Sequence, residues 1–501
     1  MAENCFCHFN GYEVKDAKAR ATAEEHAIKI AEVTAAIEAI AFDSVEAMKN
    51  SADLKVGMIA KTTGYYNPGD YGGAFYLVHS EKPATHSEEL YSGLFAELLH
   101  PDGVLNVNTY GAHGDGVTND VDFINKALIE ASFEKIKTVY FPSQDYYVDG
   151  ELIVKRGQTH LQGCHSGTTI TTIDYCVEES CLFHVTNVMV TMDGLKLAAT
   201  YEEPRFTGSP KKAAVYFDML SGPNPDNQNV DADIRNCAFY DFGYGIKLYG
   251  RNVNVRNCVF TYGCYAIYEE KHDGFENRDY VIENNRFHSV GAPNSYGFSR
   301  GCIALCGFYD NEERAILING NFADYSATFV SGNINGCTIK NNTIRYQRDG
   351  YFVFAMRDGT AAEQHNKFHT VIANNDYEYY CAESASVSRM GDTAVKLKGV
   401  YGVTIIGNTI SGGKRAAIHA ISCGDIKISD NNFVNCPYVY GADAYVIQIT
   451  NKQGYACVMN NISRAADTNG SNNAIHGIIA NVALDLNANN LLKSRSGDST
   501  V

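Results

Sequence analysis

A short unit, apolar-x-Asn-Asn-x-apolar, recurs from residue 234 onward and constrains the fold more than any other feature. Successive copies lie 21 to 33 residues apart, and one interval of 57 residues contains a shortened copy, Ile318–Phe322. Repeats of this length with one short strand each are typical of a solenoid. We therefore predict one long β-solenoid. The full copies are Ile234–Phe239, Val255–Phe260, Ile282–Phe287, Ile339–Ile344, Ile372–Tyr377, Ile405–Ile410 and Ile428–Phe433.

The paired asparagines have a physical explanation. A sharp bend between two strands requires left-handed backbone, which Asn tolerates, and the Asn amide can also bond to the equivalent Asn of the next coil. Cys237 and Cys258 occupy the same position in two neighbouring copies. We predict that they are stacked, buried thiols and not metal ligands.

Composition excludes several classes of protein. The 501 residues are 45% hydrophobic, which is typical of a folded chain. The 41 Lys and Arg against 58 Asp and Glu give a formal net charge of −17. A field of that sign repels phosphate backbones, so we expect no nucleic-acid partner. No apolar run is long enough to span a bilayer, so we expect no membrane insertion.

The cysteines and the N-terminal residues argue against cofactors and export. The 15 cysteines are odd in number and contain no Cys-x-x-Cys pair, so neither a disulfide framework nor a zinc ribbon is indicated. The nearest metal motif, Cys5-x-Cys7-His8, has no second ligand pair nearby. The first twenty residues contain charges and no apolar run, so we expect no signal peptide. We predict no metal and no cofactor.

Residues 16–41 have the composition of a helix. They are rich in Ala, Glu, Lys and Ile, without Gly or Pro, and the positions of a seam from Ala19 to Ile40 alternate at spacings of 4 and 3 residues. β-Branched residues fill both core positions of the last two heptads, which favours three or four strands over two. We predict a short coiled coil that makes the protein a homotrimer. The alternative is one amphipathic helix lying on a globular domain.

Three segments resemble parts of known proteins. Gly57–Val78, with short β-rich runs around Asn-Pro-Gly, resembles the head module that precedes the β-helix in many bacteriophage tailspikes and tail fibres. Leu105–Pro142 contains a strand, the turn Gly114-Asp115-Gly116, a capped helix and a second strand. This segment resembles the opening of the pectate-lyase-like superfamily, which includes polygalacturonases, pectate lyases and phage tailspikes. Phe6–Arg20 looks like the start of tail proteins from phages and prophages of gut Firmicutes.

The resemblance implies an all-β, right-handed, single-stranded parallel β-helix with an N-terminal coiled coil and a small α+β head module. We expect a virion-proximal segment and coiled coil at 1–42, the head module at 43–100, the β-helix with its capping helix at 101–440, and last rungs and tail at 441–501. We interpret Asp115 and Asp120 as structural, because the superfamily uses this segment as a lid. The N-terminus would bind the phage tail or baseplate.

Loops of variable length follow one strand of each repeat, and we expect all of them at one edge of the solenoid. They are mostly acidic, and carboxylates on adjacent or next-but-one rungs would lie about 5 to 10 Å apart, as glycosidases require. The predicted catalytic residues are Glu270, Asp273, Asp310, Glu312, Asp358 and Glu363. The predicted substrate-binding residues are Arg278, Arg314, Arg357, His272, His365 and Tyr351. The alternative is that these charges are solvated surface.

Function follows from the resemblance and the loops together. We predict a tailspike-like protein of the virion tail that binds and depolymerises a bacterial surface glycan, such as a capsule, O-antigen or exopolysaccharide. Hydrolase and lyase chemistry both stay open, and the polygalacturonase-type motifs are missing from the repeats. The alternatives are a receptor-binding tail protein that does not cleave, and a secreted extracellular bacterial glycanase.

Overall fold

The computed structural model divides the chain into two compact units, with the boundary after Gly111. It describes residues 39–133, 138–155, 159–173, 180–186, 189–200, 212–218, 229–270, 277–291, 301–305, 314–345, 351–356, 369–378, 393–412, 416–434, 436, 445–452, 454–464, 476–480, 486–488 and 490–492. The predicted coiled coil lies outside these residues, except for its last positions. We predicted that the head module ends at residue 100, and the structure divides the two units after Gly111.

The first unit is a small sheet with one short helix. Its strands are β1 (Ile40–Phe42), β2 (Ile59–Thr62), β3 (Phe75–His79), β4 (Ser87–Glu89), β5 (Phe95–Leu99) and β6 (Val104–Asn106). The first five form one sheet in the order β1-β2-β3-β5-β4. The helix α2 (Val45–Lys49) begins after Ser44, whose hydroxyl accepts a hydrogen bond from the Ala47 amide, and the 3₁₀ turn η2 covers Val107–Tyr110.

One part of the helix prediction is wrong. Ile40 and Ala41, the end of the predicted helix, lie in β1. Ile40 aligns with Ala60 and Ala41 with Lys61 in a parallel pairing of β1 with β2. The backbone hydrogen bonds that a helix would make within itself are thus made with a neighbouring strand, because the sheet offers this segment a partner that the heptad pattern does not reveal.

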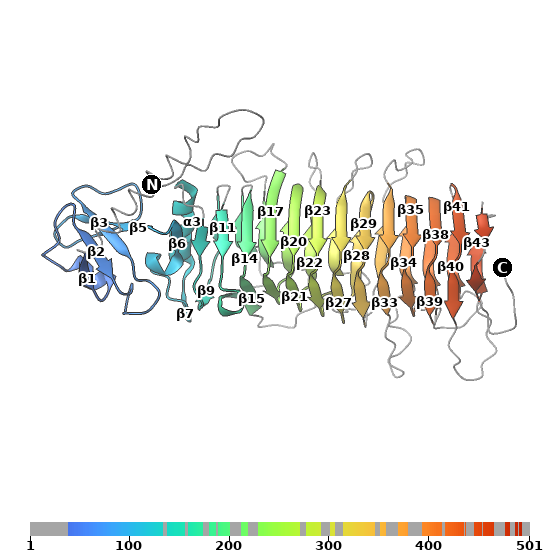
Figure 1. The fold of residues 1–501 in the computed structure, drawn as a ribbon, viewed down its shortest axis with the longest axis horizontal. Helices are drawn as coiled ribbons and strands as arrows, with labels where there is room; N and C mark the ends of the chain where they lie inside the picture. Colours follow the sequence, from blue (N-terminus) through green and yellow to red (C-terminus); the bar gives the residue numbers. More distant parts are fainter. Residues whose placement is uncertain are drawn as a thin grey trace, which may run out of the picture. The chain divides into compact units, whose positions relative to one another are not determined.

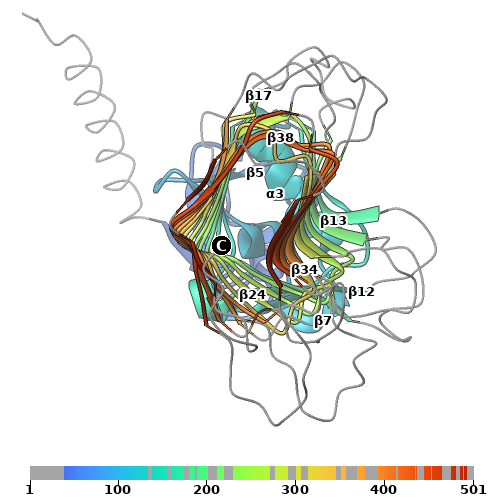
Figure 2. The same ribbon diagram turned by 90° about the vertical axis from the view of Figure 1, so that its right-hand side faces the viewer.

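The second unit is a solenoid of three parallel sheets (Figures 1 and 2). Sheet 1 contains β8 (Thr138–Tyr140), β11 (Thr159–Gln162), β14 (Val190–Asp193), β17 (Asn229–Arg235), β20 (Arg251–Arg256), β23 (Arg278–Glu283), β26 (Ile316–Asn319), β29 (Cys337–Lys340), β32 (Thr370–Ala373), β35 (Tyr401–Ile406), β38 (Gly424–Ser429), β41 (Ala456–Met459) and β44 (Leu486–Ala488). Sheet 2 contains β7 (Asp115–Asn119), β9 (Asp145–Tyr147), β12 (Thr169–Ile173), β15 (Lys196–Thr200), β18 (Ala238–Tyr240), β21 (Val259–Thr261), β24 (Arg286–His288), β27 (Phe322–Asp324), β30 (Thr343–Arg345), β33 (Asp376–Glu378), β36 (Thr409–Ser411), β39 (Asn432–Val434), β42 (Ile462–Arg464) and β45 (Leu491–Leu492).

Sheet 3 completes each coil and leads back to sheet 1. Its strands are β10 (Leu152–Val154), β13 (Ser180–Val185), β16 (Lys212–Phe217), β19 (Tyr244–Leu248), β22 (Tyr265–Glu269), β25 (Gly301–Leu305), β28 (Thr328–Gly332), β31 (Val353–Met356), β34 (Thr393–Lys398), β37 (Ala416–Ile421), β40 (Tyr445–Thr450) and β43 (His476–Ala480). Figure 2 is a view along the axis of the solenoid, in which the three sheets form three sides around the interior. Each strand aligns with its equivalents, so identical positions form columns along the solenoid.

The interior is made of such columns. In sheet 3, Ile246, Ile267, Ile303, Val330 and Val353 lie in register and are all buried. In sheet 2, the rings of Phe239 and Phe260 stack with centroids 4.6 Å apart, and Phe287 continues the stack at 5.3 Å. Parallel strands repeat every ~4.8 Å, so equivalent apolar side chains pack on each other in every coil.

The asparagine pairs lie at the corner between sheet 1 and sheet 2, and their two members have different roles. The first member has left-handed backbone, with φ of 55° at Asn341 and at Asn374, and glycine takes this position at Gly320 and Gly407. The second member is buried and joins a ladder of amides, in which Asn342 Nδ2 donates to Asn375 Oδ1 at 2.9 Å. The ladder comprises Asn285, Asn321, Asn342, Asn375, Asn408, Asn431, Asn461 and Asn490.

The predicted bend and the predicted ladder are both present, but the expectation that one Asn supplies both is wrong, because each belongs to a different member of the pair. Cys237 and Cys258 occupy the ladder position in two earlier coils, and both are buried. Burial and the contact with Cys237 raise the pKa of the Cys258 thiol. The prediction of stacked, buried thiols is confirmed.

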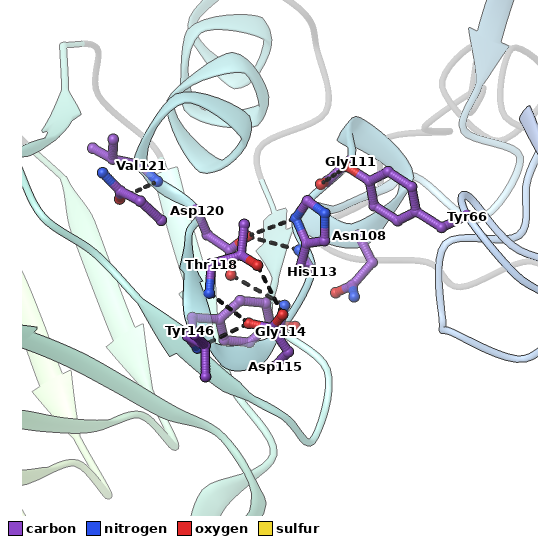
Figure 3. A network of polar contacts seen from close by, with 12 residues as sticks. Tyr66, Asn108, Gly111, His113, Gly114, Asp115, Thr118, Asp120, Val121 and Tyr146 are labelled. Atoms are coloured by element: carbon purple, nitrogen blue, oxygen red, sulfur yellow. Dashed lines mark hydrogen bonds and ion pairs between the residues drawn. The ribbon is translucent and has the colours of Figure 1, made fainter. Parts of the chain in front are cut away.

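The helix α3 (Val121–Phe133) covers the N-terminal end of the solenoid, as predicted. The Asn125 side chain accepts a hydrogen bond from the Ile153 amide and donates to the Glu151 carbonyl, so it satisfies the exposed edge of β10. The turn before α3 is held by two aspartates (Figure 3). Asp115 accepts from the amides of residues 117 and 118, and buried Asp120 accepts from those of residues 113 and 114. Both carboxylates are therefore structural.

Within the part of the chain that the structure describes, no helix has both the length and the apolar character needed to cross a membrane.

Candidate functional site

On the outer side of sheet 3, the residues change from coil to coil. In β22, Tyr265 and Tyr268 are both partly exposed on this side, with ring centroids 5.1 Å apart. The column that includes Tyr268 reads His184, Tyr216, Lys247, Tyr268, Ala304, Ser331, Phe354, Lys396, His419 and Gln448 along the sheet. We call this surface the outer face of sheet 3.

Glu270, which directly follows β22, is held on this face by two side chains. Lys247 Nζ lies 2.9 Å from Glu270 Oε1, and the Tyr216 hydroxyl donates to Glu270 Oε2 at 3.0 Å. Lys247 Nζ also lies 4.6 Å from the centroid of the Tyr216 ring. The Glu270 side chain is 24% exposed, so its carboxylate is both oriented by neighbours and open to solvent.

A second polar group lies at the N-terminal end of the same face. His184 lies between two carboxylates, with Nδ1 3.3 Å from Glu151 Oε2 and Nε2 3.0 Å from Asp218 Oδ2. The buried Tyr249 hydroxyl donates to the other oxygen of Asp218 at 2.9 Å. The Cys181 thiol lies 3.4 Å from Glu151 Oε1. The His184 ring stacks on Tyr216 with centroids 5.9 Å apart, so the two polar groups adjoin.

The charges of these groups depend on each other. The hydrogen bond with Glu151 raises the pKa of His184, Asp218 adds to the effect, and burial opposes it. In return, the contact with His184 lowers the pKa of Glu151. Burial, reinforced by the Glu270 charge, raises the pKa of Tyr216, so this phenol stays protonated and acts as a donor. The face therefore presents oriented carboxylates together with cationic and hydroxyl donors.

Aromatic rings extend the face in both directions along the solenoid. Tyr244 and Tyr265 stack on neighbouring coils with centroids 5.6 Å apart, and Tyr268 lies 4.8 Å from Tyr244. Three coils beyond Tyr265, Tyr351 stacks on Phe354 at 4.8 Å, with Lys396 Nζ 5.6 Å from the Tyr351 centroid. Rings of this kind supply flat apolar surface with a polar edge, which suits the faces and hydroxyls of sugars.

A protein-family model matches the start of the solenoid. The model is described as rhamnogalacturonase A/epimerase, pectate lyase-like, and it matches residues 104–181. No curated protein is similar to the chain in sequence. Among solved structures, the catalytic unit of the GH87 α-1,3-glucanase of Streptomyces thermodiastaticus has a TM-score of 0.51 at 12% identity, over 80% of this chain and 72% of that one. The chain has a pectate-lyase-like, right-handed β-helix fold.

Two tailspikes are also similar in structure. The enzymatically active domain of tailspike protein 2 of bacteriophage CBA120 has a TM-score of 0.47 at 11% identity, over 89% of this chain. The present chain spans 56% of that protein. A tailspike of the Acinetobacter baumannii bacteriophage Fri1, a capsular polysaccharide depolymerase, has a TM-score of 0.47 at 12% identity, over 89% of this chain and 76% of that one. At these identities the likeness concerns the fold alone.

The structure describes four of the predicted site residues. Glu270 and Tyr351 lie on the outer face of sheet 3. Arg278 lies at the start of β23 in sheet 1, 37% exposed, with Nε 3.6 Å from Asp279. Arg314 is only 5% exposed; it pairs with buried Glu269 and donates to the carbonyls of residues 277 and 333. The Arg314 guanidinium thus connects coils inside the solenoid and offers a substrate almost no surface.

The other eight predicted residues lie outside the described residues, and their roles stay predictions. They are Asp273, Asp310, Glu312, Asp358, Glu363, Arg357, His272 and His365. The strands that flank their loops are β22 and β23, β25 and β26, and β31 and β32. Each loop therefore leaves sheet 3 and enters sheet 1, which agrees with the expected common edge.

Sequence reasoning missed Tyr216, Lys247, His184 and Asp218. These residues belong to strands or strand ends, whereas the residues predicted from the sequence lie mostly in loops. The signal that was present is the alignment of the sheet 3 strands, since Tyr216, Lys247 and Tyr268 share one register position. The exact bounds of β13 and β16 were needed to extend that column to His184.

Proposed function

We propose that this protein is a tailspike-like protein that binds a bacterial surface polysaccharide along the outer face of sheet 3 and cleaves it beside Glu270. One observation carries the proposal: Glu270, oriented by Lys247 and Tyr216, lies within a row of partly exposed rings on a regular sheet. A linear glycan has a repeating row of apolar faces and hydroxyls, and a solenoid with ~4.8 Å between coils presents binding groups at a matching regular interval.

Glu270 has the features of a catalytic carboxylate. The ion pair with Lys247 and the hydrogen bond from Tyr216 orient it, and its remaining exposure leaves it accessible to a substrate. An oriented carboxylate can act as the general base or nucleophile of a glycosidase, or as the base of a lyase. A second carboxylate is required for hydrolysis, and we predict that it comes from Asp273, Asp310 or Glu312, in the loops after β22 and β25, with Asp358 and Glu363 further along.

The finer parts of the proposal concern assembly. We propose that the protein is a homotrimer that attaches to the phage tail through its N-terminal segment. The heptad pattern from Ala19 supports this, although its final positions belong to β1. Light scattering of the full chain should give three times the mass of one chain. The mass of a single chain would contradict the homotrimer proposal and favour a secreted glycanase.

The function is tested with purified capsule, O-antigen and exopolysaccharide preparations. New reducing ends with the ultraviolet absorbance of an unsaturated uronate would indicate a lyase, and new ends without that absorbance a hydrolase. Glu270→Gln should strongly slow the release of new ends while the glycan still binds. A glycan that binds but is never shortened would identify a receptor-binding protein, and neither binding nor cleavage of any preparation would contradict the proposal.

A further inference from the structure

Three side chains with different donor atoms converge at the N-terminal end of the outer face of sheet 3. Glu151 precedes β10, and Cys181 and His184 both lie on β13, in register with Ala213 and Tyr216 of β16. One ligand atom from each residue lies within 4.8 Å of the other two. Cys181 lies 30 positions after Glu151 and 3 positions before His184, so the sequence contains no spaced motif that predicts all three together. Only the stacking of neighbouring coils brings them together.

Two contacts of Glu151, one at each of its carboxylate oxygens, have lengths close to the edges of a metal tetrahedron. Zn²⁺ bonds of about 2.0 Å to nitrogen or oxygen and 2.3 Å to sulfur give edges of about 3.3 to 3.6 Å. His184 Nδ1 lies 3.3 Å from Glu151 Oε2, and Cys181 Sγ lies 3.4 Å from Glu151 Oε1. Imidazole, thiolate and carboxylate are also the three ligand types that Zn²⁺ takes in proteins.

The surroundings of His184 provide a second, independent observation. Metal-bound histidines donate their other ring N–H to a carboxylate, which orients the ring. His184 Nε2 lies 3.0 Å from Asp218 Oδ2, and Asp218 is itself held by the buried Tyr249 hydroxyl at 2.9 Å. This arrangement turns Nδ1 toward Glu151 and Cys181. A histidine that served only to pair with Glu151 would not need Asp218 and Tyr249 to orient its ring.

The exposure of the three ligands indicates an open site. Cys181 is buried, whereas the Glu151 side chain is 39% exposed and that of His184 is 22% exposed. Three protein ligands with one side toward solvent leave a fourth position for water or a substrate oxygen. The adjoining Tyr216 ring connects this position to Glu270 along the same face.

We propose that Glu151, Cys181 and His184 bind one divalent transition-metal ion, with Zn²⁺ as the best match, and that Asp218 is a positioning residue for His184. On binding, the Cys181 S–H bond breaks, the sulfur bonds to the metal and the proton passes to solvent. This site does not depend on the proposed glycan function, since a metal can be measured directly without any substrate.

The test uses the full chain, stripped with a chelator and titrated with ZnCl₂ by calorimetry, with metal content measured by mass spectrometry. We expect one Zn²⁺ per chain, and with Co²⁺ a thiolate-to-cobalt charge-transfer band. Cys181→Ser and His184→Gln should each abolish the stoichiometric binding and the band. Asp218→Asn should weaken Zn²⁺ binding about 10- to 100-fold and keep the band.

Two controls separate this site from other thiols. Cys237→Ser changes a buried cysteine of the asparagine corner and should leave Zn²⁺ binding unchanged. The double variant Cys5→Ser/Cys7→Ser removes the thiols of the N-terminal motif and should also leave it unchanged. Absence of stoichiometric Zn²⁺ in the parent chain, binding that survives Cys181→Ser, or binding lost with Cys5 and Cys7 would each overturn the proposal.

Discussion

The corner between sheets 1 and 2 and the outer face of sheet 3 follow opposite rules. At the corner, one amide position repeats in coil after coil, from Asn285 to Asn490, because each amide bonds to the one above it. On the outer face, one register position changes from His184 to Tyr216 to Lys247 to Tyr268 in four successive coils. Repetition therefore marks what the solenoid needs in order to stack, whereas the outer face can vary from coil to coil, and we propose that it binds a ligand. Substitutions at the two places should have separable effects.

The largest effect is expected on the outer face, and only on activity. Glu270→Gln keeps the shape of the side chain and removes its charge, so cleavage of a polysaccharide that the protein degrades should slow by about 10²- to 10⁴-fold. The melting temperature should change little. Initial rates of reducing-end release measure this, with Glu89→Gln, an exposed acid of the first unit, as the matched control. Full activity of Glu270→Gln would remove Glu270 from the mechanism.

The next largest effect is expected at the buried pair of Arg314 and Glu269, and only on stability. Arg314→Met leaves buried Glu269 without its charged partner, so the free energy of unfolding should fall by about 3 to 5 kcal/mol. Arg278→Met, which changes an arginine with 37% exposure, should cost less than about 1 kcal/mol. Urea denaturation of both variants checks the difference. Equal losses would mean that the Glu269 pair contributes no more than a surface contact.

A smaller loss of stability is expected at the corner. Asn375→Ala removes one amide of the ladder and leaves the Asn342 donors without their acceptor, so it should cost about 1 to 3 kcal/mol. Asn374→Gly changes the adjacent residue, where φ is 55° and glycine is the natural alternative, and should cost less than about 1 kcal/mol. If thermal unfolding ranks the two variants in the reverse order, the division of roles within the Asn pair is wrong.

The smallest effect is expected at the aromatic extension of the outer face. Tyr351→Ala removes a ring that stacks on Phe354 and should weaken glycan binding by about 0.5 to 1.5 kcal/mol. Calorimetry with a non-cleaved oligosaccharide measures the affinity, and Tyr91→Ala, a highly exposed ring of the first unit, should leave it unchanged. If Tyr351→Ala binds the oligosaccharide with unaltered affinity, the glycan-binding surface does not extend as far as β31.

Much of the fold was predictable because the repeat is itself the physical requirement. The Asn pairs locate the corner, and the helix after the Gly114–Gly116 turn covers the open end. The N-terminal helix prediction failed at Ile40 because a heptad pattern does not show that a parallel partner strand is present. Local pattern and tertiary pairing compete at such a boundary.

The candidate site was predictable only in part. Glu269 and Glu270 are adjacent identical residues at the end of β22, yet one is buried against Arg314 and the other faces solvent beside Lys247. Loop composition favoured Arg314 as a substrate-binding residue, whereas the structure places its guanidinium in the interior. His184, Asp218 and Glu151 are distant in sequence, and no spacing rule connects them.

The sequence by itself determined that this chain is a solenoid, where its corners lie, and that buried amides and thiols stack at one of them. It did so because stacking demands the same residue type at each turn, and repetition is visible in one dimension. The tertiary structure alone decided which of two neighbouring acids faces out, and which residues from three different coils meet around His184. Those choices depend on register and on the side to which each strand position turns, and both arise only when the coils pack on one another.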